Sequence, residues 1–135
     1  MNYFLAKTEP STYSVEDFQN EGVSVWNGVK SPQALKYIRA MQPGDRVFIY
    51  HSTGQSAIVG LAEVISEPQP DPKIKKSWMV EMEFLQMISP PVTLKEIKQS
   101  GLFEDFRLVY QSRLSTMEVP ENFLEWLRKV KRLKV

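Results

Sequence analysis

The sequence contains no cysteine and only one histidine, His51. The missing cysteines exclude a disulfide framework, a thiolate-ligated metal site and a thiol nucleophile. A single histidine excludes any mechanism or metal site that needs two imidazoles from one chain. No apolar run approaches the roughly 20 residues of a membrane span, and residues 1–10 lack the apolar core of a secretory signal. We therefore expect a cytoplasmic protein with no membrane partner, no metal ion and no cofactor.

What is present is the composition of an ordinary globular protein. The chain has 135 residues, of which 42% are hydrophobic and 24% are charged. This length is typical of one domain, and the charged and apolar fractions are those of a folded chain. We expect residues 1–135 to form a single domain.

The basic residues are concentrated at one end. Residues 128–135 carry five of the 17 basic residues and no acid, which leaves 12 basic against 16 acidic residues, a net charge of −4, in residues 1–127. One interpretation is a helix end whose cations suit the helix dipole. The other is a phosphate-contacting tail. The candidates for phosphate contact there are Arg128, Lys129, Lys131 and Arg132.

Hydrophobic periodicity and breaker residues predict an α+β fold. Strands are expected over 3–6, 45–50, 57–65, 78–85 and 114–119. Helices are expected after the capping residues Ser14, Ser31 and Thr93 and after Pro120, and the second of these helices is expected over 32–41. The proline-rich segment 67–72 is expected to be an extended loop. Because strands and helices do not alternate, a small curved sheet or barrel with peripheral helices fits best.

Two glycine signals refine this picture. The strands over 45–50 and 57–65 are joined by a short polar loop that contains Gly54, which predicts a hairpin. Gly60, inside the second strand, predicts a bulge or the close approach of another part of the backbone.

Catalytic patterns are missing. His51 and Ser52 are adjacent, but neighbouring strand residues point to opposite faces, and no G-x-S-x-G elbow is present. Neither a Walker A motif nor a G-x-G-x-x-G loop occurs. We therefore expect a binding protein and not an enzyme.

One segment has the residue types of a nucleotide site. Trp26 offers a planar surface on which a base can stack. Lys30 supplies a cation beside the helix that begins at Pro32, whose first backbone N–H groups suit a phosphate. The alternative for Trp26 is a place in the hydrophobic core, which sequence alone slightly favours.

An ordered series of short motifs resembles the EVE domain family. The first block runs from Phe4 to Pro10, and Trp26 to Lys30 with Gln33-Ala34 form the second. Gly44-Asp45, Tyr50-His51-Ser52, Val59-Gly60 and Pro70-Asp71 continue the match, which ends with Leu114 to Met117. Each motif is weak alone, but their order is specific and covers nearly the whole chain.

The resemblance implies a PUA-like fold, a small mixed β-barrel with peripheral helices, related to the YTH readers of methylated RNA. It implies a non-catalytic module that binds DNA or RNA carrying a modified base, notably a modified cytosine, flipped into an aromatic pocket. The pocket positions carried over are Lys7, Tyr13, Trp26, Val29, Lys30, Ser31, His51, Ser52 and Ser115, and Lys30 is also expected to contact phosphate. The chain departs from the family at Asn27, where aspartate is common, and at residues 30–32, where Arg-Asn-Tyr is common.

Each of these residues has a plainer interpretation. Lys7 can pair with a surface acid, Tyr13 can pack in the core, Ser31 can cap a helix and His51 can satisfy a buried hydrogen bond. Trp78 and Trp126 are expected to pack in the core. Two competing functions also remain: a small-molecule or partner-binding accessory module that uses the same pocket, and an enzyme that uses His51. The negative body argues against a broad phosphate-binding face.

Overall fold

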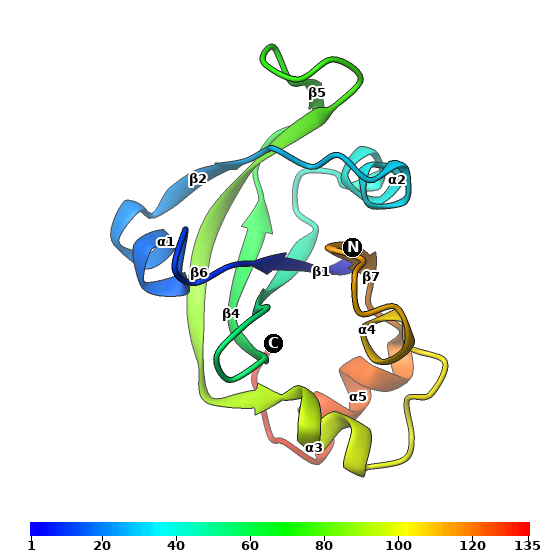
Figure 1. The fold of residues 1–135 in the computed structure, drawn as a ribbon. Helices are drawn as coiled ribbons and strands as arrows, with labels where there is room; N and C mark the ends of the chain where they lie inside the picture. The colour runs from blue at the N-terminus through cyan, green and yellow to red at the C-terminus, as the bar shows by residue number, and fades with distance from the viewer.

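Seven strands and five helices make up the computed structural model, which describes residues 1–135 (Figure 1). The strands are β1 (Tyr3–Thr8), β2 (Val23–Trp26), β3 (Arg46–His51), β4 (Ala57–Val64), β5 (Gln69–Pro70), β6 (Trp78–Thr93) and β7 (Thr116–Glu118). The helices are α1 (Val15–Glu21), α2 (Pro32–Ala40), α3 (Leu94–Gln99), α4 (Arg107–Tyr110) and α5 (Glu121–Lys129). The predicted α+β class is confirmed.

The strands form one open sheet in the order β2-β6-β4-β3-β1-β7, and β5 pairs with β6. Only β1 and β3 run parallel, and all other pairs are antiparallel. Because β2 and β7 do not pair with each other, the closed barrel that the family resemblance implied is not confirmed. Helix α2 packs against β6 and β7 and buries Ala34, Tyr37 and Ile38 in the core.

The helix starts follow the predicted capping signals. Ser14 and Thr93 each form a capping box with the acidic residue three positions later, Asp17 and Glu96. The Ser31 hydroxyl accepts from the Ala34 amide at 3.4 Å, and α2 begins at Pro32. These caps satisfy amide groups that a helix start leaves without intrahelical partners.

Two strands differ from the prediction. Residues 23–26 form β2, an edge strand that pairs only with β6, although no strand was predicted there. Strand β6 continues to Thr93 in spite of Pro90 and Pro91. Its register against β4 jumps between Met87 and Val92, so both prolines lie where no regular ladder amide is needed.

Two smaller corrections concern termini of elements. Gln69 and Pro70 were expected in a loop, but they form a two-residue strand with Met79 and Trp78. The spacing of Phe123, Leu127 and Val130 predicts one apolar face of the C-terminal helix, but Val130 is 63% exposed because the helix ends at Lys129. None of the helices has the length and apolar character that crossing a bilayer requires.

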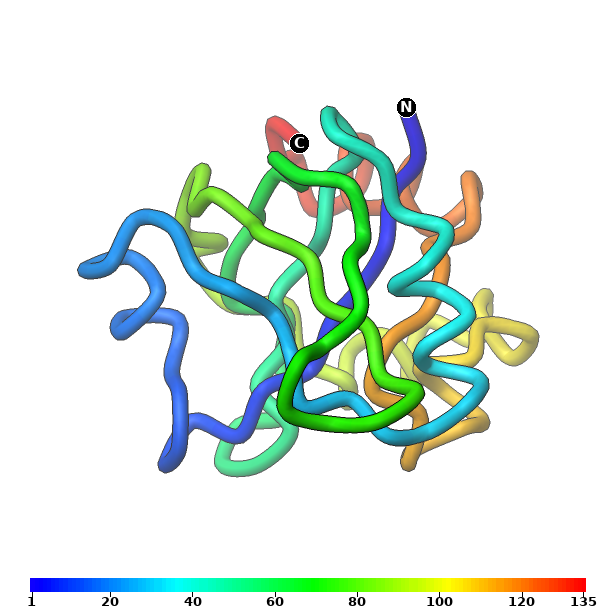
Figure 2. The backbone as a smooth tube through the Cα atoms, turned by 90° about the horizontal axis from the view of Figure 1, so that it is seen from above, coloured from blue at the N-terminus to red at the C-terminus, as the bar shows by residue number.

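The upper end of the molecule in Figure 1 holds α2, β5 and the start of β6, while α3 and α5 lie at the lower end. Seen from above, the loop that follows β5 passes close to α2 (Figure 2). Residues 74–78 and α2 line a common cavity there. The fold therefore separates a loop-rich upper end from the C-terminal helix.

Candidate nucleic-acid interface

A cavity of about 600 Å³ opens beside Trp26, and we call it the Trp26 cavity. It is formed by the end of β1 and the loop after it, the end of α1, and β2 with the residue that follows. Its lining residues are Lys7, Thr8, Glu9, Thr12, Tyr13, Glu21, Ser24, Val25, Trp26 and Asn27. This volume lies in the range of small-molecule sites, roughly 300–1,000 Å³.

Trp26 is both a core residue and a cavity wall. Its side chain is only 9% exposed and belongs to the hydrophobic core. Its ring lies edge-to-face with the Tyr13 ring, with 6.1 Å between the ring centroids, and its centroid lies 5.8 Å from that of the Phe18 ring. Since aromatic packing fixes the orientation of the indole, the cavity has a rigid aromatic wall.

Lys7 is the only cation that lines the Trp26 cavity. Its Nζ donates to the Ser112 carbonyl at 2.8 Å and lies 5.5 Å from the centroid of the Tyr50 ring. Burial lowers the pKa of Lys7, because desolvation disfavours the charged amine. No acidic side chain lies within ion-pair distance of this ammonium.

Two carboxylates share the cavity with Lys7. Glu9 accepts from the Thr53 hydroxyl at 2.8 Å and from the Ser11 amide at 3.2 Å. These hydrogen bonds, that from Thr53 foremost, lower the pKa of Glu9 and favour its ionised form. The second carboxylate, Glu21, accepts a hydrogen bond from the Tyr13 hydroxyl.

The Tyr13 phenol is held in its neutral form. Burial is the main cause that raises its pKa to about 12, and the hydrogen bond to Glu21 adds to the effect. The cavity thus combines one ammonium, one neutral phenol and two carboxylates beside an aromatic wall. This set can donate to and accept from the polar edge of a planar ligand.

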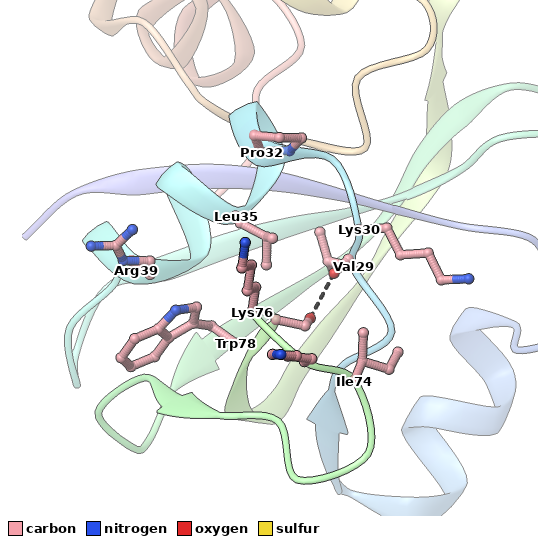
Figure 3. A pocket seen from close by; sticks show the side chains of 10 residues that line it. Val29, Lys30, Pro32, Leu35, Arg39, Ile74, Lys76 and Trp78 are labelled. Carbon is pink, nitrogen blue, oxygen red and sulfur yellow. Dashed lines mark hydrogen bonds between the residues drawn. The ribbon is translucent and has the colours of Figure 1, made fainter.

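A second cavity, of about 530 Å³, lies between α2 and the loop before β6 (Figure 3). We call it the basic cavity, because four cations and no carboxylate line it. Its lining residues are Val29, Lys30, Pro32, Leu35, Arg39, Ile74, Lys75, Lys76, Ser77 and Trp78. Arg39 lies against the ring of Trp78, with 5.4 Å between the guanidinium carbon and the ring centroid.

The sequence profile of the EVE domain matches residues 2–130. The chain belongs to the EVE domain family. This confirms the resemblance drawn from the sequence motifs. Rat thymocyte nuclear protein 1 is 28% identical over 162 residues, an alignment that covers 93% of this chain and 72% of the relative.

Solved structures agree with the family. Rpa0253 from Rhodopseudomonas palustris matches this EVE domain with a TM-score of 0.91 and 34% identity, covering 100% of this chain and 97% of the other. Human THYN1 protein in complex with DNA that contains 5-methylcytosine matches with a TM-score of 0.88 and 23% identity over 100% of both chains. At that identity the second match shows the shared fold.

The predicted base-pocket residues do not all lie together in the EVE domain. Lys7, Tyr13 and Trp26 line the Trp26 cavity, whereas Val29 and Lys30 line the basic cavity. The remaining four, Ser31, His51, Ser52 and Ser115, line neither of these cavities.

Those four residues have structural partners. Ser31 caps α2, and His51 Nε2 accepts from the Val15 amide at 3.0 Å. The Ser52 hydroxyl donates to the Thr8 carbonyl at 3.3 Å. The Ser115 carbonyl accepts a hydrogen bond from the Lys7 amide at 2.8 Å. His51, Ser52 and Ser115 therefore support the frame of the Trp26 cavity from outside its lining, whereas Ser31 supports α2, which lines the basic cavity.

The C-terminal cations lie at the end of the EVE domain opposite to α2 and β5 (Figure 1). Arg128 donates to the Val135 carbonyl at 3.1 Å and to the Tyr3 hydroxyl at 3.2 Å. Lys131 is paired with Glu96, and Lys129 lies 4.0 Å from Glu125. Phosphate contact by this tail stays a prediction.

Most residues of the basic cavity were not predicted from the sequence. Trp78 was expected in the core, but it is half-buried and faces this cavity. Arg39, Lys75 and Lys76 were not singled out, although three lysines between positions 73 and 76 precede the tryptophan. A basic run next to an aromatic residue was the available signal. No group of three or more potential metal ligands of the His, Cys, Asp and Glu types lies together.

Proposed function

We propose that this EVE domain binds DNA and reads a modified cytosine that is flipped into the Trp26 cavity. The observation that carries the proposal is the cavity itself, which joins a rigid aromatic wall to a cation and two carboxylates. The human THYN1 structure, whose DNA contains 5-methylcytosine, supports the choice of ligand class. Membership of the same family supports carrying that class over to this chain.

The donors and acceptors of the cavity suit a cytosine edge. Cytosine offers an exocyclic amine that donates and two ring-side positions that accept. Glutamate is a known acceptor for that amine, and Glu9 and Glu21 both line the cavity. Lys7 and the hydroxyl of Thr12 can donate to the accepting positions, whereas the Thr8 hydroxyl already donates to the Tyr13 carbonyl at 2.6 Å.

A methyl group alone gives little selectivity. Burial of one methyl contributes about 0.8 kcal/mol, or about fourfold in affinity. Additional discrimination therefore has to come from the hydrogen-bonding groups around the base. For this reason substitutions of the polar side chains test the proposal better than substitutions of the aromatic wall.

The proposal is binding without a chemical step. His51, the one imidazole, lies outside the cavity lining, and its Nε2 is engaged by the Val15 amide. A general base needs a free position within reach of the reacting proton. Flipping costs a few kcal/mol of stacking and pairing, which contacts to the cavity must offset.

The test is a fluorescence-anisotropy titration with short DNA strands that differ only in one cytosine or 5-methylcytosine. The arms are the wild type, Glu9→Gln, Lys7→Gln and, as a control, Glu125→Gln on α5. We expect the wild type and the control to prefer the modified strand, and Glu9→Gln to lose most of that preference. Equal binding of both strands by the wild type would overturn the proposal. RNA strands with the same substitution test the choice of DNA.

A small-molecule sensor is the second candidate, because the two carboxylates of the Trp26 cavity repel a phosphate. It predicts that a free modified nucleoside binds as well as a strand does. It also predicts little dependence on salt, since no counterions are released from phosphates. The same titration at two salt concentrations separates the two functions.

A further inference from the structure

The basic cavity is positively charged, whereas the chain around it is mildly acidic. Lys30, Arg39, Lys75 and Lys76 line it, although residues 1–127 carry a net charge of −4. The protein has two ion pairs, Lys129–Glu125 and Lys131–Glu96, and neither involves these four cations. Four unpaired cations around one concave surface attract an anion.

The walls of the basic cavity are apolar and aromatic. Val29, Leu35, Ile74 and the half-buried Trp78 contribute its carbon surface. Figure 3 shows Arg39 beside the Trp78 ring and Lys30 extending away from it on the other side of the cavity. With Arg39 5.4 Å from the centroid of the Trp78 ring, an aromatic surface flanked by positive charge borders the cavity, which suits a base joined to a phosphate.

Hydrogen bonds hold the loop of the basic cavity in place. The buried Ser77 hydroxyl donates to the Val29 carbonyl at 2.6 Å, which ties the loop before β6 to the segment after β2. The buried Asp71 accepts from the Lys73 amide at 2.8 Å, and its own amide donates to the Ser77 carbonyl at 2.9 Å. A loop fixed in this way loses less conformational entropy when a ligand binds.

The two cavities are neighbours along one stretch of chain. Asn27 lines the Trp26 cavity and Val29 lines the basic cavity. Only Gly28, with a φ of 76°, lies between them. Two residues span at most about 7 Å of chain. The two walls thus come within about the spacing of one nucleotide at this point.

We propose that the basic cavity binds the nucleotide next to the modified base, with its base against Trp78 and its phosphate on Lys75 and Lys76. This inference rests on the proposed function and extends it, because it assigns a flanking subsite outside the cavity that reads the base. The subsite supplies affinity for the strand and contributes nothing to recognition of the modification. Arg39 positions the Trp78 ring.

The experiment is the same anisotropy titration with the double variant Lys75→Gln/Lys76→Gln. The matched control is Lys95→Gln/Lys98→Gln on α3, which removes two lysines that are also exposed, at the other end of the molecule. Each protein is titrated with modified and unmodified single strands over a series of salt concentrations. Thermal melting of both variants verifies that they are folded.

We expect the Lys75/Lys76 variant to bind both strands more weakly, with the ratio of their affinities unchanged. The plot of log affinity against log salt concentration should become less steep by about 0.7, the value for one single-strand phosphate contact. A variant that matches its α3 control in affinity and in slope would overturn the inference. Failure of the proposed function is a different result, because the wild type itself would then show no preference for the modified strand.

Discussion

A Cβ atom placed on Gly60 would lie 2.7 Å from Cγ2 of Val15. Val15 is the first residue of α1, and Gly60 lies in β4 where the register shifts against both β3 and β6. The bulge predicted at Gly60 is confirmed by these shifts, whereas the group that approaches closely is a side chain and not another part of the backbone. Because α1 rests directly on the β4 backbone, this contact positions Glu21, the α1 residue that lines the Trp26 cavity.

Gly60→Ala should therefore destabilise the protein by about 1–3 kcal/mol, the usual cost of overpacking a filled core. The measurement is urea denaturation followed by tryptophan fluorescence. Val15→Ala removes the opposing methyl groups, so the double variant should be more stable than the sum of the two single effects predicts. Strictly additive effects would show that the two positions do not interact.

His51 also holds α1, through the 3.0 Å hydrogen bond from the Val15 amide to its Nε2. His51→Phe leaves that partly buried amide without an acceptor and should cost about 1–3 kcal/mol. His51→Gln keeps an acceptor and should cost less. Urea denaturation of both variants measures the difference. If His51→Phe instead kept full stability but lost the preference for modified DNA, His51 would be a base-pocket residue.

The raised pKa of Tyr13 predicts that the stability of the protein changes at alkaline pH. Its pKa of about 12 in the folded protein lies above the ordinary tyrosine value of 10.0. Between these values the unfolded chain has lost the phenol proton and the folded chain has kept it, so stability falls as pH rises. Tyr13→Phe should lose less stability over this interval. We expect the ultraviolet absorbance titration of the wild type to contain a tyrosinate step near pH 12 that the titration of Tyr13→Phe lacks.

The elements that sequence analysis located correctly are those with local signals. Capping residues fixed the starts of α1, α2 and α3, and alternation of apolar and acidic residues located the first half of β6. Strand β2 and the second half of β6 depend on pairing with distant strands. No local preference marks such pairing, because β-structure reflects its tertiary neighbours.

The candidate site shows the same division. Motif order led to Lys7, Tyr13 and Trp26, which the fold brings together in one cavity. It also grouped Val29 and Lys30 with them, but Gly28 turns the chain and directs these residues to the basic cavity. Trp78 was assigned to the core because strand alternation cannot tell a buried face from one that borders a cavity.

The C-terminal cations provide the last prediction. Arg128 and Lys131 have intramolecular partners, Lys129 forms only a solvent-exposed ion pair with Glu125 one helical turn away, and Arg132 is exposed. If the tail serves the end of α5, Lys129→Gln/Arg132→Gln should cost a few tenths to about 1 kcal/mol of stability through the helix dipole. Binding of DNA strands should then stay as in the wild type, with the same salt slope.

This double variant removes the same charge as Lys75→Gln/Lys76→Gln, so the two sites are compared directly. A fall in strand affinity and a less steep salt dependence for the tail variant, with stability unchanged, would make the tail a phosphate-binding element.

The geometry favours unchanged DNA binding by the tail variant. The tail lies at the end of the molecule away from α2 and β5 (Figure 1), whereas Lys75 and Lys76 line the basic cavity, whose wall residue Val29 is two positions from Asn27 of the Trp26 cavity. Charge close to the read base contributes to a short complex, and charge far from it contributes only when the strand is long enough to reach. Lengthening the strand should therefore reveal any contribution of the tail, while the effect of Lys75 and Lys76 should already be complete in short strands.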